Sequence, residues 1–472
     1  MKKAKIVATL GPASESREMM IKLIRAGVNV FRINFSHSSH DKAKELIDRI
    51  RGINEELGCY VAILADLQGP KIRVGNVAAD ALLKRGDEFI LEVGEFEGNA
   101  SRASINYIDF AADVKPGERI LLDDGKLVLE VEATDGDKQV RTRVVQGGPL
   151  RSKKGVNLPN TQVSLPCLTE KDERDLEFAL EMEVDWIALS FVRRASDITE
   201  IKSKIKAAKA WSKVIAKIEK PSAVTDIESI VEESDAIMVA RGDLGVEIPM
   251  QRVPLIQKMI CELGRKHARP VIIATQMMES MLNQITPTRA EVNDVANSVL
   301  DGADAVMLSG ETSVGEYPLE VVENMAKIIM HIEESGEIRR EANPPKNPND
   351  VRYVSDSICY NSSRMAEQVQ ATAILTMTHS GYTAFRISSH RPNAQVFAFT
   401  SNRKIMSTLS LVWGVSSFYY DSFESTDETF RDIKKIIHNK RLVEKGDLII
   451  KIASMPMNER GMSNMMKIGE IK

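Results

Sequence analysis

The stretch VIAKIEKP, residues 214–221, carries three charged side chains at the end of an apolar, strand-like run. The next such run, AIMVARGDLG at residues 236–245, also ends in charged residues. Charged side chains at the carboxyl ends of apolar strands are typical of active sites in α/β barrels. Lys217 and Glu219 are two positions apart, so both side chains should point to the same side of the strand. Glu219 and Asp243 offer oxygen ligands that suit a divalent cation, and the Lys217 ammonium suits an anionic substrate.

Outward from this stretch, short apolar runs alternate with amphipathic, charge-rich segments, as in βα units around a parallel sheet. Strands are expected at residues 5–10, 28–35, 60–66, 185–191, 214–219, 236–240, 270–275 and 305–309. Helices are expected at residues 14–25, 40–57, 222–232 and 318–333. Because a (β/α)8 TIM barrel requires eight strands, the pattern predicts an α/β protein built on such a barrel.

Two segments interrupt this rhythm. Residues 70–166 contain many Gly and Asp turns between short alternating runs such as 88–93 and 126–131, which predicts a small inserted β-barrel able to act as a lid. Residues 343–350, NPPKNPND, are too rich in Pro and Asn to continue a helix. The predicted organisation is a barrel at 1–69 and 167–342, a lid domain at 70–166 and a C-terminal α/β domain at 343–472. In the last domain, helices are expected at 354–369 and 427–439, and strands at 373–378, 395–400 and 447–453.

Composition limits the function classes. The 63 Lys and Arg nearly balance the 67 Asp and Glu, so the total charge gives no reason to expect nucleic acid or an anionic membrane as a partner. No apolar run approaches the roughly 20 residues of a membrane span, and residues 1–10 read as a first strand and not as a secretion signal. The four cysteines lack CxxC spacing and are expected to be reduced thiols of a cytoplasmic protein.

Eight segments resemble the pyruvate kinase family, in the family's order and across essentially the whole chain. They are AKIVATLGPAS (4–14), FRINFSH (31–37), DLQGPKIR (66–73), SKKGVNLP (152–159), AKIEKP (216–221), ARGDLGVEIP (240–249), ATQMMESM (274–281) and MLSGETSVGEYP (307–318). The resemblance implies transfer of a phosphoryl group from phosphoenolpyruvate to ADP, giving pyruvate and ATP in glycolysis. It also implies a mobile β-domain lid, a C-terminal effector domain and a homotetramer.

Phosphoryl transfer needs positive charge on the moving group, a bridging metal and exclusion of water. The resemblance makes Glu219 and Asp243 the ligands of Mg²⁺ or Mn²⁺, and Lys217 the group that stabilises the transferring phosphoryl and the enolate. It makes Arg32 a phosphate-binding residue, in keeping with its bidentate guanidinium. For the remaining catalytic and substrate-binding roles it indicates Gly242 and Thr275, which would receive the substrate carboxylate, and Ser309 and Glu311, which would relay a proton.

For the nucleotide, the resemblance indicates Asn34, Phe35, Ser36, His37, Arg73 and, from the lid, Lys154. Many family members also hold a monovalent cation with residues that correspond here to Asn34, Ser36, Asp66 and Leu67. This chain departs from their pattern because it has Leu67 and Gln68 after Asp66, and Lys71 after Gly-Pro. The departure resembles the potassium-independent branch, in which a lysine ammonium replaces the ion, so activity without K⁺ is predicted.

In the C-terminal domain, hydroxyls and a glycine before a helical start predict an anion site, which the resemblance makes the loop for an effector phosphate. The loop residues are Thr378, His379, Ser380, Gly381, Tyr382 and Thr383. The later loop at 456–464 departs from the form common in members activated by fructose bisphosphate. AMP or a sugar monophosphate is therefore the preferred effector.

Two other functions compete with this interpretation. A metal-dependent barrel lyase acting on pyruvate-like substrates would use a Glu/Asp metal pair, but it would not need Arg73, Lys154 or a lid. A catalytically silent metabolite sensor would be expected to have lost charged residues at the site, and none of these positions has lost its charge.

Overall fold

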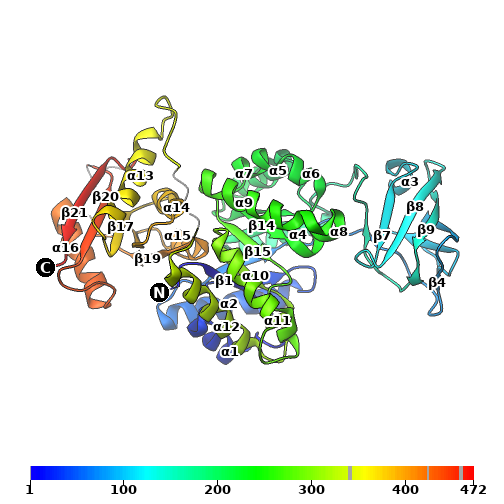
Figure 1. Ribbon diagram of the computed structural model, residues 1–472, viewed down its shortest axis with the longest axis horizontal. Coiled ribbons are helices and arrows are strands. Elements are labelled where there is room, and N and C mark those ends of the chain that lie inside the picture. Colours follow the sequence, from blue (N-terminus) through cyan, green and yellow to red (C-terminus); the bar gives the residue numbers. More distant parts are fainter. Residues whose placement is uncertain (1, 339–342, 423–424, 456–460) are drawn as a thin grey trace.

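The computed structural model describes residues 2–338, 343–422, 425–455 and 461–472, and Figure 1 shows three bodies in a row, with the barrel between the C-terminal domain and the inserted domain. The eight predicted barrel strands form a closed parallel barrel in the order β1-β16-β15-β14-β13-β12-β3-β2, which confirms the predicted fold class. Their bounds are β1 Lys5–Thr9, β2 Val30–Asn34, β3 Ala62–Asp66, β12 Trp186–Leu189, β13 Lys213–Ile218, β14 Ala236–Ala240, β15 Val271–Ala274 and β16 Ala305–Leu308.

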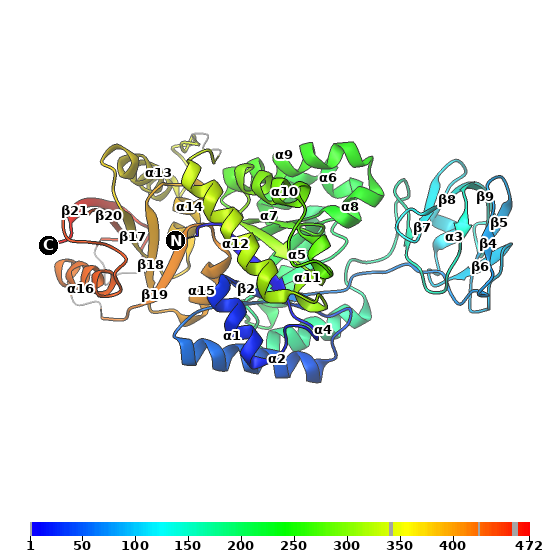
Figure 2. The same ribbon diagram turned by 60° about the horizontal axis from the view of Figure 1, so that its bottom comes forward.

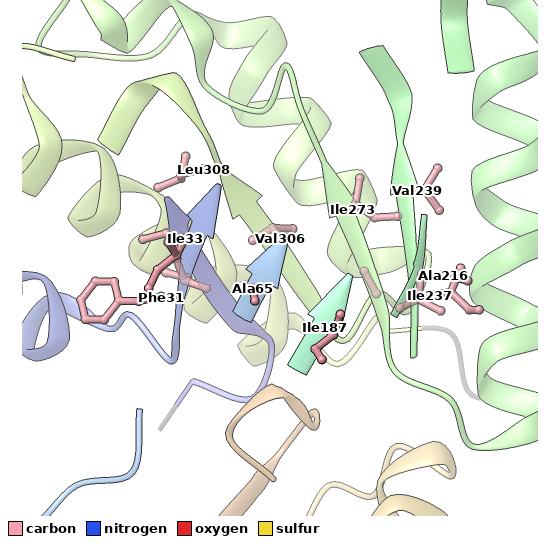
Figure 3. Close-up of a cluster of buried hydrophobic side chains, with 14 of the residues drawn as sticks. Phe31, Ile33, Ala65, Ile187, Ala216, Ile237, Val239, Ile273, Val306 and Leu308 are labelled. Carbon is pink, nitrogen blue, oxygen red and sulfur yellow. The ribbon is translucent and has the colours of Figure 1, made fainter. Parts of the chain in front are cut away.

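The strands separate two apolar layers. One set of side chains fills the barrel interior and includes Val7, Val30, Leu64, Ala188, Ile215 and Met238. The other set packs under the surrounding helices, and Figure 3 shows several of its members, among them Ile33, Ala65, Ile187, Ala216, Val239 and Leu308. Because side chains alternate along a strand, every second residue after an interior residue also faces the interior. The polar residues at the strand ends are positioned by this alternation.

Helices surround the barrel, as Figure 2 shows. Their bounds are α1 Arg17–Ala26, α2 His40–Leu57, α4 Glu170–Glu181, α5 Ala195–Ala207, α6 Pro221–Thr225, α7 Ile227–Glu233, α8 Arg241–Glu247, η1 Met250–Arg252, α9 Val253–His267, η2 Glu279–Leu282, α10 Arg289–Leu300, α11 Gly310–Ser313 and α12 Pro318–Ser335. The single helix predicted at 222–232 is wrong, because the chain divides at Asp226 into α6 and α7. The Asp226 carboxylate instead accepts a hydrogen bond from Ala195 N at 3.0 Å, at the start of α5.

The inserted segment forms a six-stranded sheet in the order β11-β7-β8-β9-β5-β6 and a two-stranded sheet, β10-β4, over its own apolar core. Its elements are β4 Leu82–Leu83, β5 Glu88–Val93, β6 Arg102–Ile105, α3 Phe110–Asp113, β7 Arg119–Leu122, β8 Leu127–Thr134, β9 Gln139–Gln146, β10 Gly148–Pro149 and β11 Val156–Asn157. Barrel side chains hold both connecting segments. In the segment that enters the inserted domain, Gly69 N donates a hydrogen bond to the Asp172 carboxylate at 3.0 Å. In the segment that leaves it, Leu165 O accepts a hydrogen bond from Arg193 at 2.7 Å.

The C-terminal domain has a five-stranded sheet in the order β19-β18-β17-β20-β21, in which only β21 is antiparallel to its neighbour. Its elements are α13 Tyr353–Gln368, β17 Ala373–Met377, α14 Tyr382–Ser389, β18 Gln395–Thr400, α15 Arg403–Thr408, η3 Leu409–Leu411, β19 Val415–Tyr419, α16 Thr426–Asn439, β20 Leu448–Ala453 and β21 Met465–Glu470. The domain boundaries given above stay predictions.

A buried ion pair joins this domain to the barrel. Arg391, which is 1% exposed, places Nη2 2.8 Å from Oδ2 of Asp304, directly before β16. The neighbouring His390 lies edge-on against Tyr360. Burial, together with Arg386, Arg265 and Arg391, lowers the pKa of His390 to about 4.

The His390 environment predicts acid sensitivity. An ordinary histidine has a pKa near 6.5, so between about pH 6.5 and pH 4 the unfolded chain binds more protons than the folded chain. The free energy of unfolding should therefore fall as the pH is lowered through this window, by up to about 3 kcal/mol. We expect His390→Gln to reduce this fall, measured as the difference in melting temperature between pH 7.5 and pH 4.5. His331→Gln, on an exposed helical residue, is the control. A wild-type slope in the His390 variant would contradict the prediction.

The four cysteines are free, as predicted. None of the described helices combines the length and apolar character needed to cross a bilayer.

Candidate active site

Arg32, Asp66 and Lys217 form a buried ion network at the carboxyl end of the barrel, and each lies two positions after an interior apolar residue. Arg32 Nε donates to Asp66 Oδ2 at 2.6 Å, and Lys217 Nζ lies 3.2 Å from Asp66 Oδ1. Burial works to raise the pKa of Asp66, but Lys217 and Arg32 outweigh burial and keep that pKa below its ordinary value. Asp66 therefore stays ionised and holds both cations at the strand ends.

Lys217 and Glu219 do share one side of β13, since Lys217 Nζ lies 2.9 Å from Glu219 Oε1. Glu219 Oε2 accepts from Phe191 N at 2.9 Å, which fixes the carboxylate. Burial acts to lower the pKa of Lys217, but Asp66 and Glu219 outweigh burial and raise that pKa above its ordinary value. The ammonium is therefore charged at neutral pH.

Asp243 adds a second carboxylate to the site. It lies in the first turn of α8. Burial and the Glu219 carboxylate raise the pKa of Asp243 to about 6. A bound cation would favour the charged form of Asp243. Within the described ranges there is no group of three or more His, Cys, Asp or Glu residues that could hold a metal. One or two carboxylates are the protein ligands that Mg²⁺ commonly uses, with its other positions left for water and substrate.

The structure brings together Gly242 and Thr275, the two residues expected to receive the substrate carboxylate, and joins them by a hydrogen bond. Gly242 N donates to Thr275 Oγ1 at 2.8 Å, and Thr275 Oγ1 donates to Ala274 O at 2.6 Å. Thr275 has a positive φ of 67°, an uncommon conformation for a β-branched residue. A carboxylate that binds here would have to replace the bond between Gly242 and Thr275.

Ser309 and Glu311 lie at the end of β16. Ser309 N donates to Glu311 Oε2 at 2.7 Å, and Met278 N donates to Glu311 Oε1 at 3.3 Å. Burial raises the pKa of Glu311 even though these amide bonds act in the opposite direction. A carboxyl group that holds its proton more tightly than usual is suited to proton transfer.

The predicted nucleotide-binding residues divide between the barrel and the inserted domain. Asn34 Oδ1 accepts from Ser36 N at 3.1 Å, and His37 is exposed beside them. Phe35 is completely buried, so its side chain does not face a ligand. In the inserted domain, Arg73 Nη1 donates to Lys153 O at 2.8 Å, and Lys154 Nζ lies 2.9 Å from Asp123 Oδ1.

Lys71 lies in the electrostatic field of the site. Burial lowers the pKa of Lys71, and Lys217 and Arg73 lower it further, whereas Asp243 and Glu219 act in the opposite direction. Among the other residues predicted for the monovalent cation or its substitute, Leu67 is buried and its N–H donates to Ala188 O at 3.1 Å.

A cleft of about 980 Å³ joins this site to the inserted domain. Its lining includes Gly242, Asp243 and Thr275 from the barrel, and Asp124 and Asn157 from the insert. Asn157 Nδ2 donates at 2.8 Å to Glu247 Oε1, at the last residue of α8. The insert therefore already contacts the helix that carries Asp243.

The predicted effector loop has an ordered local structure. Gly381 has a φ of 84° and donates its N–H to Thr378 Oγ1 at 2.9 Å. His379 and Ser380 are exposed, while Tyr382 donates to Asp356 Oδ1 at 2.6 Å. Thr383 Oγ1 lies 3.0 Å from Ser463 Oγ, in the later loop. Residues 456–460 of that loop lie outside the described residues.

Sequence reasoning missed two contributors to the site. Ser190 Oγ accepts from Lys217 Nζ at 2.7 Å, and Arg241 makes a bidentate pair with Asp294, with both nitrogen–oxygen distances 2.7 Å. Ser190 lies two positions after the interior residue Ala188, so strand alternation could have found it. Asp294 is on α10 and far from Arg241 in the chain, so no local pattern indicates that contact.

A closed (β/α)8 barrel with two carboxylates, a charged lysine and an arginine at the carboxyl ends of its strands defines a barrel enzyme for anionic substrates. Residues 1–322 match the model of the pyruvate kinase barrel domain, and residues 356–469 match that of the pyruvate kinase alpha/beta domain. The chain therefore belongs to the pyruvate kinase family.

Similar proteins are found among bacteria and among solved structures. The pyruvate kinase of Mycobacterium tuberculosis is 42% identical, covering 100% of this chain and 98% of the relative. The Corynebacterium glutamicum pyruvate kinase is 42% identical, covering 99% and 97%. The crystal structure of a Cryptosporidium parvum pyruvate kinase matches with a TM-score of 0.92 at 32% identity, covering 100% of this chain and 96% of that one.

Proposed function

We propose that this chain transfers the phosphoryl group of phosphoenolpyruvate to ADP, giving pyruvate and ATP in the cytoplasm as the final step of glycolysis. The observation that carries the proposal is the joint placement of Lys217, Arg32 and the Glu219–Asp243 pair at one end of the barrel. This arrangement combines fixed positive charge with a metal-binding carboxylate pair, which phosphoryl transfer requires.

Each charged residue has a distinct task in this reaction. Arg32 binds the phosphate oxygens, and Asp66 fixes its guanidinium for that role through the 2.6 Å bond. Lys217 stabilises negative charge on the transferring group and on the enolate oxygen that remains. Because both cations are only 12% exposed and are already oriented by Asp66, little reorganisation is needed when charge develops.

Glu219 and Asp243 would hold Mg²⁺ or Mn²⁺. The raised pKa of Asp243 supports this role, because a bound cation would offset both the burial and the repulsion from Glu219 that disfavour the charged carboxylate. The bound cation would neutralise phosphate charge and align the substrate oxygens.

Protonation of the enolate completes the reaction. Thr275 offers a hydroxyl beside Gly242, where the substrate carboxylate would displace the existing bond. Glu311, whose pKa is raised by burial, would hold the proton and pass it along a path that includes Ser309 and water.

The inserted domain would act as the lid over the nucleotide. Arg73 and Lys154 provide positive charge for the ADP phosphates, and Asn34, Ser36, His37 and the Phe35 main chain would form the facing side. Because Lys154 is paired with Asp123 at 2.9 Å, nucleotide phosphate would compete with that carboxylate for the ammonium.

We expect substantial activity without K⁺, because Lys71 brings a fixed positive charge to the field of Asp243 and Glu219. Steady-state rates in Tris or tetramethylammonium buffer should remain high, and added K⁺ should change them little. Lys71→Glu should lower the K⁺-free rate and make it respond to K⁺. Lys84→Glu, at an exposed position of the lid, is the matched control. A wild-type rate that collapses without K⁺ and recovers with it would refute this prediction.

The C-terminal domain is proposed to bind a phosphorylated effector, AMP or a sugar monophosphate, at the Thr378–Thr383 loop. The exposed Ser380 hydroxyl and the start of α14 support anion binding there. Calorimetry should detect binding of one of these metabolites, with a loss in the Ser380→Asp variant because it places negative charge in the loop. Absence of binding and of any kinetic effect would rule out the effector site. A homotetramer is proposed on the family resemblance alone.

A coupled assay for pyruvate tests the central proposal. With phosphoenolpyruvate, ADP and Mg²⁺ the chain should form pyruvate, and omission of ADP or of Mg²⁺ should abolish the reaction. Pyruvate formation that does not depend on ADP would favour the barrel lyase, whereas ligand binding without turnover would favour the silent sensor.

A further inference from the structure

The serine hydroxyl that contacts Lys217 has no role in the reaction proposed above. Among the residues that the structure describes, Lys217 Nζ has three oxygen contacts: Ser190 Oγ at 2.7 Å, Glu219 Oε1 at 2.9 Å and Asp66 Oδ1 at 3.2 Å. Ser190 provides the shortest of the three and is the only neutral partner. It is 1% exposed, so bulk water does not compete for the contact.

The direction of the Ser190 hydroxyl is fixed by a second bond. Ser190 Oγ donates its single proton to Leu67 O at 2.7 Å, so the lone pairs of the oxygen remain for Lys217. Leu67 N in turn donates to Ala188 O at 3.1 Å, which ties this segment to the strand that leads to Ser190. Gly69 packs closely as well, since a Cβ placed on it would lie 2.9 Å from Ser190 Cβ. The acceptor is therefore held in one position.

The other two partners of Lys217 have competing bonds. Asp66 also binds Arg32, and Glu219 is a ligand of the divalent cation in the proposed function. When the Glu219 carboxylate binds a cation, part of its negative charge is neutralised, so its attraction for the Lys217 ammonium weakens. Ser190 has no such alternative, because its proton is already committed to Leu67.

We propose that Ser190 is a positioning residue for phosphoryl transfer, which keeps the Lys217 ammonium aimed at the reacting phosphoryl group while Glu219 serves the metal. This inference rests on the proposed function. A misplaced ammonium would lose its transition-state contact, whereas the binding of substrate by Arg32 and the metal ligands would be retained.

The test compares Ser190→Ala with Ser190→Thr in the coupled assay. Loss of a hydrogen bond to a charged group corresponds to roughly a 10- to 100-fold effect, so kcat of Ser190→Ala should fall by about that factor. KM for phosphoenolpyruvate should stay within about threefold. Ser190→Thr keeps the hydroxyl and should recover most of kcat. Ser190→Cys, a weaker acceptor of similar size, should be intermediate, and it serves if the alanine variant does not fold.

Ser212→Ala is the matched control. Ser212 is also buried, and its hydroxyl donates a hydrogen bond to Val184 O at 2.6 Å. These two residues lie just before β13 and β12, at the opposite ends of these strands from Lys217 and Ser190. A crystal structure of Ser190→Ala should show Lys217 Nζ displaced, which is a readout independent of turnover. If Ser190→Ala keeps wild-type kcat, if its loss equals that of Ser212→Ala, or if Lys217 stays in place, Ser190 has no positioning role. Failure of the wild-type chain to form pyruvate would refute the proposed function itself.

Discussion

Lys217→Met is expected to lower kcat for pyruvate formation by at least about 10³-fold while the protein remains folded. Removal of one group that stabilises transition-state charge typically costs about 10²- to 10³-fold, and in the proposed function Lys217 stabilises both the phosphoryl group and the enolate. Met retains the length of the side chain, so the barrel interior keeps its packing. Steady-state kinetics at saturating substrate measures the loss, and circular dichroism with a melting curve checks the fold.

Lys213→Met is the matched control for this substitution. Lys213 lies on the same strand with the same alternation, but at its other end, where Nζ is 3.4 Å from Asp235 Oδ1. Its replacement should leave kcat within about twofold, because Lys213 is partly buried but lies at the opposite end of the strand from the candidate site. Turnover retained in Lys217→Met would remove Lys217 from the mechanism.

Glu219→Gln is expected to weaken Mn²⁺ binding by at least about 10-fold, since even the outer partners of a metal site contribute that much. Gln keeps the size of the side chain and one oxygen that can accept from Phe191 N, so the loss is mainly one of charge. The kcat/KM for phosphoenolpyruvate should fall with the metal affinity. Titration of Mn²⁺ by electron paramagnetic resonance measures binding without any need for turnover.

Glu228→Gln provides the comparison for this prediction, because Glu228 is an exposed acid that pairs with Lys266 at 2.9 Å, away from the site. It should bind Mn²⁺ as the wild type does. Equal Mn²⁺ affinity in Glu219→Gln and in the wild type would show that the metal lies elsewhere.

Much of the barrel could be predicted because each strand is a short apolar run bounded by turn residues. The predicted strand at 236–240 agrees in full with β14, and the two-residue spacing of Lys217 and Glu219 predicted that their side chains lie on the same side of the strand, where they are in contact. Local pattern was sufficient in these cases, because alternation along one strand decides which way a side chain points.

The contacts between distant segments could not be predicted in this way. Asp66 holds Arg32 and Lys217 together, but only the closed barrel brings these three strands to one end. The helix predicted at 222–232 failed for a related reason, because its apolar pattern does not reveal that Asp226 caps α5. Likewise, the hydrogen bond from Gly242 N to Thr275 Oγ1 forms because β14 and β15 are neighbours in the barrel, and neither sequence segment alone indicates it.

The inserted domain also has a consequence for the order of folding. Barrel closure pairs β3 with β12, and Ile63 N reaches Asp185 Oδ2 across 122 positions of chain. Closing so long a flexible loop has a large entropic cost, and contacts that are distant in sequence form slowly. The insert brings its own ends together, since Val74 N donates to Lys154 O at 3.0 Å. An inserted domain that folds first would reduce this loop to its two short connecting segments, so the insertion would also help the barrel to close during folding.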